Sequence, residues 1–235
     1  MLDQFIRAVL WLHIVAGFTG FFVAPVALVT RKGGNTHRKW GKVYFWAMTI
    51  SVLSSLIVAA YRPNIFLFLI GIFSFYLAFS GYRVLRRKSP EVGQSATALD
   101  WTVASLTLAT SLFMLIYGSM SFTTFAVRLN PILLLFGVLG LLAAGSDMYR
   151  FVWPSADKNA WYFDHMSGMV ASYIAAVSAF SVVNFAFLPL LARWLWPTVV
   201  GAPLLVLWIT RYKIKLHRAK KSVAVPAYEL TGEPV

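Results

Sequence analysis

The chain has 235 residues, a formal net charge of +13 and no cysteine. Its residues are 59% apolar and only 12% charged, which is about half the charged content of a typical soluble domain. A soluble protein of this length needs a polar shell around its core, so this composition excludes a soluble domain and predicts a chain embedded in lipid. The absence of cysteine excludes disulfides, thiolate metal sites and CxxCH haem attachment.

Seven apolar stretches of about bilayer-spanning length follow one another along the chain. The first is too long, and its start too weakly basic, for a cleavable signal peptide, so we expect it to be a retained helix. The expected spans are residues 5–29, 41–61, 65–85, 100–118, 130–149, 161–183 and 196–211.

The sequence therefore predicts an all-α, polytopic transmembrane helical bundle over residues 1–212. A basic and mobile cytoplasmic tail is expected over residues 213–235. The apolar segment 185–195, which lies between two turns, is expected on the membrane surface.

The positively charged residues alternate between the two sides of the predicted spans. Seventeen of the 21 lysines and arginines fall after the first, third, fifth and seventh spans. Cytoplasmic loops are enriched in such cations, so the alternation predicts an N-terminus outside and a C-terminus in the cytoplasm. It also favours anionic membrane lipids over nucleic acid as the partner of the net charge.

A few ionisable side chains lie within or at the ends of the predicted spans, where such groups are costly and often functional. His13 is one of them, about two turns into the first span. Six others fall at one level, the cytoplasmic ends of the helices: His37, Arg38, Asp100, Asp147, Asp164 and His165. Their convergence predicts one polar pocket that binds or transforms a small or lipidic ligand.

The same residues allow a purely structural interpretation. Asp100 and Asp164 lie near helix N-termini, where the helix dipole favours an anion. Asp147 and Arg150 are three residues apart and can pair on one helix face. The many small side chains of the sixth span predict close helix packing, which does not account for His165, so we expect this histidine to face protein.

Three other classes of function stay open. His13 shares a helix face with Gly17 and Gly20, where a haem could fit, although no second histidine is expected at its depth. A metal-dependent hydrolase could use His37, His165 and one aspartate, but no HxxxH or HExxH pair supports a metal site. A structural or assembly factor would have no site. The chain has no GxSxG, Walker A or GxGxxG motif, so it identifies no cofactor and no reaction.

Four stretches carry a resemblance to a known family: Leu12–Gly20, Lys32–Gly41, Phe73–Tyr82, and His165–Ala175 with the following Ala179–Asn184. Together they resemble a family of uncharacterised bacterial seven-helix membrane proteins, described only as predicted membrane proteins of unknown function. The resemblance extends to about residue 211. It implies placement in the bacterial inner membrane and implies no activity.

Overall fold

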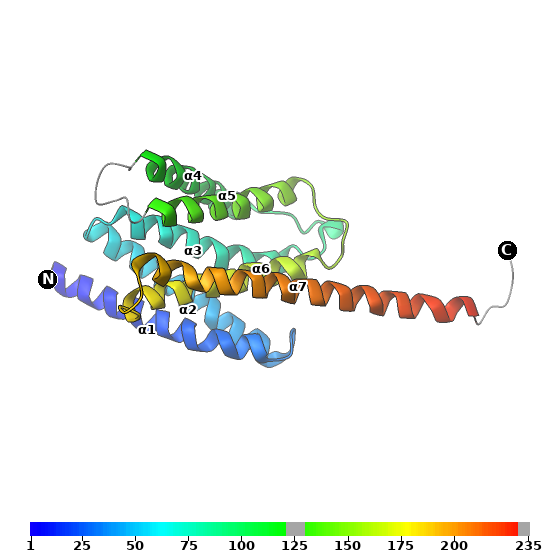
Figure 1. Ribbon diagram of the computed structural model, residues 1–235. Helices are drawn as coiled ribbons and strands as arrows, with labels where there is room; N and C mark the ends of the chain where they lie inside the picture. The colour runs from blue at the N-terminus through cyan, green and yellow to red at the C-terminus, as the bar shows by residue number, and fades with distance from the viewer. Residues whose placement is uncertain (121–129, 230–235) are drawn as a thin grey trace.

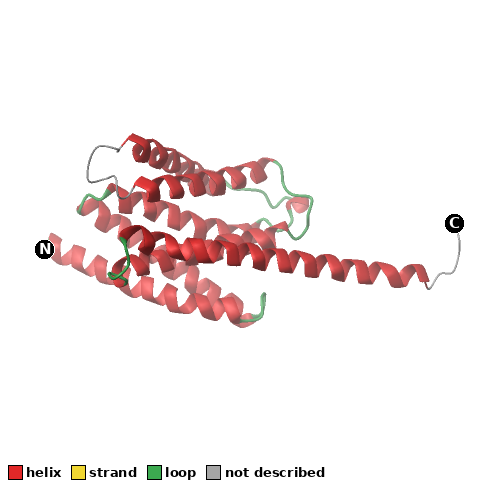
Figure 2. Cartoon of the chain, viewed as in Figure 1, coloured by secondary structure: helices red, strands yellow, loops and turns green. Residues whose placement is uncertain are grey.

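The computed structural model describes residues 1–120 and 130–229. Apart from the loops between helices, these residues are helical, and they contain no strand (Figures 1 and 2). Two short 3-10 helices, η1 (Val84–Arg86) and η2 (Pro90–Val92), connect α3 to α4. The seven α-helices are α1 (Leu2–Val29), α2 (Asn35–Tyr61), α3 (Ile65–Arg83), α4 (Ala98–Met120), α5 (Asn130–Val152), α6 (Ala160–Asn184) and α7 (Leu190–Glu229).

All seven α-helices are long and apolar enough to cross a membrane. Many large apolar side chains point outward, and Trp11, Phe22 and Leu142 are each more than 60% exposed. A surface of this kind is stable against lipid and unfavourable in water. The length and apolar composition of these helices confirm the prediction of an all-helical, multi-pass membrane protein with seven spans.

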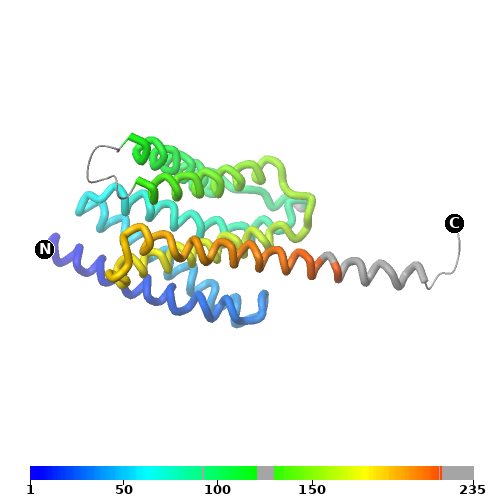
Figure 3. Tube along the Cα trace, in the orientation of Figure 1, coloured from blue at the N-terminus to red at the C-terminus, as the bar shows by residue number. Residues whose placement is uncertain are grey.

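The seventh helix differs from the prediction at both ends. Residues 190–195 belong to α7 and do not form a separate surface segment, so that prediction is wrong for them. Pro197, predicted in the first turn, lies inside the helix, which spanning helices tolerate because neighbouring groups satisfy the freed carbonyl. Beyond its apolar part, which ends at Leu216, α7 continues as a helix past the predicted boundary at residue 212 and past the other helices (Figure 3).

Consecutive helices pair as antiparallel neighbours: α1 with α2, α4 with α5, and α6 with α7 (Figure 1). Helix α3 lies between these pairs and contacts α2, α4 and α6. As a result, α1, α3 and α5 end where α2, α4 and α6 begin, on the right in Figure 1. We call this the basic end, because it contains Lys32, the cations of 83–88 and Arg150.

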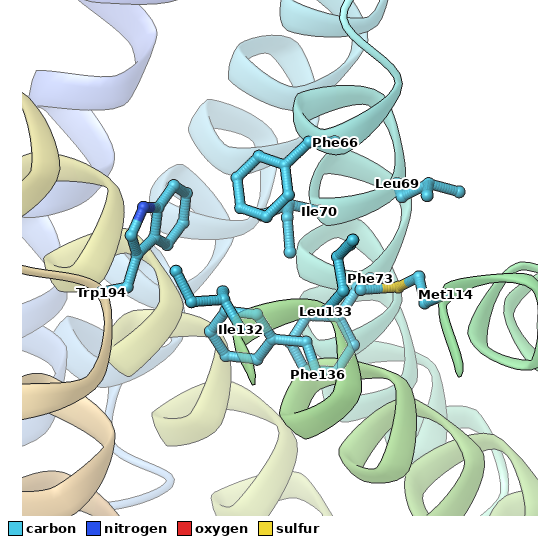
Figure 4. Packing of buried hydrophobic residues seen from close by; sticks show 9 residues of the cluster. All are labelled: Phe66, Leu69, Ile70, Phe73, Met114, Ile132, Leu133, Phe136 and Trp194. Carbon is cyan, nitrogen blue, oxygen red and sulfur yellow. The ribbon is translucent and has the colours of Figure 1, made fainter. Parts of the chain in front are cut away.

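The main apolar core lies toward the opposite end of the bundle, between α3, α4, α5 and the start of α7 (Figure 4). Phe66 meets Trp194 edge to face with ring centroids 5.2 Å apart, and the Phe73 and Phe136 centroids are 5.3 Å apart. Met114 is fully buried beside them. This packing fixes α3 against its neighbours and so determines where its polar residues lie at the basic end.

At the basic end, α3 and α6 cross with their backbones in contact. A Cβ atom added to Gly81 would lie 2.7 Å from the backbone nitrogen of Met169, and one added to Gly168 would lie 2.5 Å from the Gly81 Cα. Only glycine allows this approach on both helices. The small residues of the sixth predicted span therefore serve helix packing, as expected.

Candidate functional site

The six residues predicted for the pocket all lie at the basic end, but they do not form one cluster. Asp100 belongs to an ion cluster between α3 and α4. Asp147 and Asp164 line a pocket between α5, α6 and the segment that connects α3 to α4. His37 and His165 lie together on the other flank of α3. Arg38 is exposed, and its guanidinium donates to the Asn35 side chain of its own helix at 2.9 Å.

Asp100 is the buried centre of an ion cluster. Its side chain is 1% exposed and accepts from Arg83 Nε at 2.9 Å, Arg83 Nη2 at 2.7 Å and Arg87 Nη1 at 2.7 Å. The Thr97 backbone N–H and hydroxyl donate to the same carboxylate at 2.9 and 2.7 Å. The five donors occupy both carboxylate oxygens, so this cluster anchors the start of α4 to the end of α3 and the Asp100 carboxylate is not open to a ligand.

Asp147 is held differently. Its Oδ2 accepts from the Tyr76 hydroxyl at 2.7 Å and from the Ser80 hydroxyl, both on α3. Among the residues that the structure describes, no cation lies within ion-pair distance of this carboxylate, and none donates to its Oδ1. The predicted i, i+3 pair with Arg150 does not form, because Arg150 binds Asp164 of α6 at 2.5 Å instead.

Asp147 and Asp164 line an open pocket of about 140 Å³ at the ends of α3, α5 and α6. The Arg87 guanidinium lies 4.6 Å from the centre of the Phe151 ring, and Lys88 Nζ lies 4.5 Å from the centre of the Trp161 ring. These cation–aromatic contacts give the pocket wall both charged and apolar surface. Its charged lining residues are Arg87, Lys88, Asp147, Arg150, Asp157 and Asp164.

His165 does not line this pocket, although it follows Asp164 in the sequence. Its Nδ1 donates to the Gly81 carbonyl at 2.6 Å, and its ring centroid lies 6.2 Å from that of His37. His37 Nδ1 in turn donates to the Ala27 carbonyl near the end of α1 at 3.0 Å. Because carbonyls only accept, both rings carry their proton on Nδ1 in the neutral form.

The backbone of α3 separates the pocket from the two histidines. Ser80 bonds Asp147 on one flank, and the carbonyl of the next residue, Gly81, bonds His165 on the other. The close contact of Gly81 with α6 fills the space between the two flanks. No aspartate of the described residues is bonded to His165 or His37, and thus the two halves of the predicted pocket are separate sites.

Neither cofactor alternative finds the geometry it needs. His13 donates from Nδ1 to the Ser51 carbonyl of α2 at 2.8 Å. This histidine therefore bonds a neighbouring helix, and its Nδ1 is not available as a haem ligand. Ser51 and Met48 lie against Gly17 and Gly20, so α2 fills the face that a haem would occupy. Among the described residues, no three His, Asp or Glu side chains are placed to hold one metal ion.

Sequence reasoning missed five hydrogen-bond partners of the aspartates: Tyr76, Ser80, Arg83, Arg87 and Thr97. Tyr76 and Ser80 are spaced i, i+4 on α3, so they share a helix face, but their partner is an aspartate 71 and 67 residues further along, which no local pattern reveals. Arg83 was interpreted only as topogenic charge. Thr97 and Asp100 do have the i, i+3 spacing of a capping interaction, and this signal could have been used.

Comparisons of the chain with protein-family models, curated proteins and solved structures found no match. The geometry of the basic end is therefore the basis on which a function is proposed.

Proposed function

We propose that this chain is a multi-pass protein of the bacterial inner membrane that binds a small or lipidic ligand in the pocket around Asp147. The ligand presents an ammonium group, or another N–H or O–H donor, to the free oxygen of this carboxylate. We place the N-terminus outside and the basic end on the cytoplasmic side, so the pocket opens at the cytoplasmic ends of the helices.

The observation that carries this proposal is the contrast among the three aspartates of the basic end. Asp100 is neutralised by two arginines and Asp164 by one. Asp147 receives only neutral hydroxyl donors, and these use one of its two oxygens. Asp147 is half-buried, and one of its oxygens accepts no hydrogen bond within the described residues, so a cation or a donor beside it would be stabilising. A ligand in the adjoining pocket supplies that partner.

The pocket itself supports ligand binding over a purely structural role. A structural factor needs no polar cavity, whereas this one combines a carboxylate, cations and two aromatic faces. Sites that bind small molecules show this mixture of apolar wall and few polar groups. Its place at the helix ends puts it at headgroup depth, within reach of both lipids and cytoplasmic solutes.

The test is native mass spectrometry of the full-length protein purified in mild detergent. Asp147→Asn keeps the size of the side chain and an oxygen acceptor for Tyr76 but removes the charge. We expect a bound mass on the wild type and its loss from Asp147→Asn. The matched control is Glu91→Gln, which removes an exposed carboxylate from the same end of the bundle that does not line the pocket, and it should keep the bound mass. Equal occupancy in all three proteins, or no bound mass in any, contradicts the proposal.

The orientation has its own test. Seventeen of the 21 cations fall on the proposed cytoplasmic side. A reporter enzyme fused after residue 235 should be active only in its cytoplasmic form. Activity only in the periplasmic form would reverse the topology and place the Asp147 pocket on the outer face.

A further inference from the structure

The basic groups on the other flank of α3 form a cluster that the proposed function does not use. Lys32 Nζ and His37 Nδ1 donate to the same Ala27 carbonyl oxygen, at 3.2 and 3.0 Å, so these side chains meet at one atom. The His165 ring lies 6.2 Å from the His37 ring, centroid to centroid. Segments at the end of α1, the start of α2 and the first turns of α6 thus bring three basic side chains together.

No carboxylate compensates this cluster. Among the described residues, none is paired with Lys32, His37 or His165, and the charged groups that act on His165 are His37, Lys88 and Lys32, all of them basic. Burial lowers the pKa of the Lys32 ammonium, which is half removed from water without an anionic partner. A bound anion would offset the cost of burying the Lys32 charge, because no carboxylate of the described residues pairs with it.

The start of α2 adds to the positive potential. Its N-cap, Gly34, makes no side-chain cap, and the first turn contains no acidic residue. The unbonded N–H groups and the helix dipole at such an end attract an anion. His37 belongs to this first turn, so the side-chain cluster and the dipole act at the same place.

Each of the three side chains retains one polar position without a hydrogen bond. Two of the three ammonium protons of Lys32 go to the carbonyls of Ala27 and Leu28, which leaves one, and the Trp208 ring centre lies 5.0 Å from Nζ. Each imidazole uses Nδ1 for a carbonyl, so its Nε2 donates when the ring is protonated. With a proton on each Nε2 the cluster offers three donors, which match the oxygens of a phosphate group, while the surrounding positive charge disfavours a metal cation between the same rings.

We propose that Lys32, His37 and His165 form a phosphate-binding site, separate from the Asp147 pocket, at the junction of α1, α2 and α6. The phosphate comes either from a membrane lipid headgroup or from a soluble phosphate compound, since both present the same oxygens.

The experiment uses full-length protein with isotopically labelled histidine in lipid nanodiscs, observed by NMR. One arm titrates inorganic phosphate into phosphatidylcholine nanodiscs, and the other replaces part of this lipid with phosphatidylglycerol in phosphate-free buffer. His13 is an internal reference, because its Nδ1 also donates to a carbonyl but no basic side chain is among its contacts. We expect saturable shifts of the His37 and His165 ring signals, while the His13 signal stays in place.

Two lysine variants separate a site from general charge. Lys32→Gln should weaken binding by roughly tenfold or more, the effect of losing one charge-assisted hydrogen bond. Lys39→Gln removes a charge from the same end, where Lys39 contacts only its neighbour Trp40, and should leave binding unchanged. An unmoved His13 signal shows that each variant is folded.

A shift in one arm alone identifies the source of the phosphate, and shifts in both arms show that either serves. Unmoved His37 and His165 signals in both arms overturn the proposal. Equal weakening by Lys32→Gln and Lys39→Gln also overturns it, because the effect would then be surface charge. These readouts do not involve Asp147, so failure here leaves the proposed ligand pocket standing.

Discussion

Replacing Asp100 with asparagine should strongly destabilise the fold. Asparagine has nearly the same shape as aspartate, so the change removes the charge with little loss of packing. The Arg83 and Arg87 side chains, only 10% and 12% exposed, would keep their positive charges next to each other without the carboxylate between them. The amide nitrogen of the new asparagine, which is itself a donor, would also face N–H groups that now donate to a carboxylate oxygen.

The expected magnitude follows from these contacts. Breaking a buried ion pair from one side costs about 3–5 kcal/mol, because the remaining charge stays uncompensated. We expect the low end, about 3 kcal/mol, since both arginines retain some contact with water. For a chain of this size that corresponds to a loss of roughly 6–12 °C in melting temperature.

The assay is thermal unfolding of purified protein in one detergent, followed by circular dichroism. Asp157→Asn is the control, because Asp157 is exposed and accepts only from the nearby Asn159 N–H, and it should change stability by less than about 0.5 kcal/mol. Adding Arg87→Met to Asp100→Asn removes one uncompensated cation and should restore part of the loss. Equal melting of Asp100→Asn and Asp157→Asn would refute the reasoning, and so would strictly additive effects in the double variant.

Three further substitutions test other contacts of the bundle by the same unfolding assay. Gly81→Ala pushes a Cβ atom to within 2.7 Å of the α6 backbone and should cost about 2–3 kcal/mol, whereas Gly145→Ala meets open space and should be neutral or slightly stabilising. His13→Ala removes the bond to α2 and should cost about 1 kcal/mol without changing ligand binding at the basic end. Arg150→Ala breaks the ion pair with Asp164; the Arg150 side chain is 44% exposed and the Asp164 side chain 22%. The change should cost no more than about 1 kcal/mol, and a larger loss would show that this pair is effectively buried.

The helices could be predicted from the sequence because their signals are local. Runs of apolar residues, and cations between them, set five of the seven spans to within three residues of the observed bounds, while α2 and α7 each begin six residues earlier than predicted. The start of α7 was missed because Trp196-Pro197 has the pattern of a helix beginning. In lipid, an apolar stretch such as 190–195 is more stable as helix than as irregular chain, since its backbone groups find no water.

The level of the polar residues could be predicted, but their partners could not. Depth along the membrane follows from position in a span, and all six predicted residues are at the basic end. Which side of a helix a residue faces depends on how that helix is rotated against its neighbours. Asp164 and His165 are consecutive, and consecutive residues on a helix point about 100° apart. Asp164 therefore faces α5 and Arg150, while His165 faces α3 and His37.

A single turn of α3 holds both sites at the basic end. The Ser80 hydroxyl holds the Asp147 carboxylate, and the Gly81 carbonyl holds the His165 ring. The two sites share one turn of α3, so they cannot shift independently while the contact between Gly81 of α3 and Gly168 of α6 is intact. The two backbones touch there and have no space in which to move. The glycine contact thus does more than pack two helices. It also keeps the Asp147 carboxylate and the basic cluster of Lys32, His37 and His165 on opposite flanks of α3, so that these charges do not pair with one another.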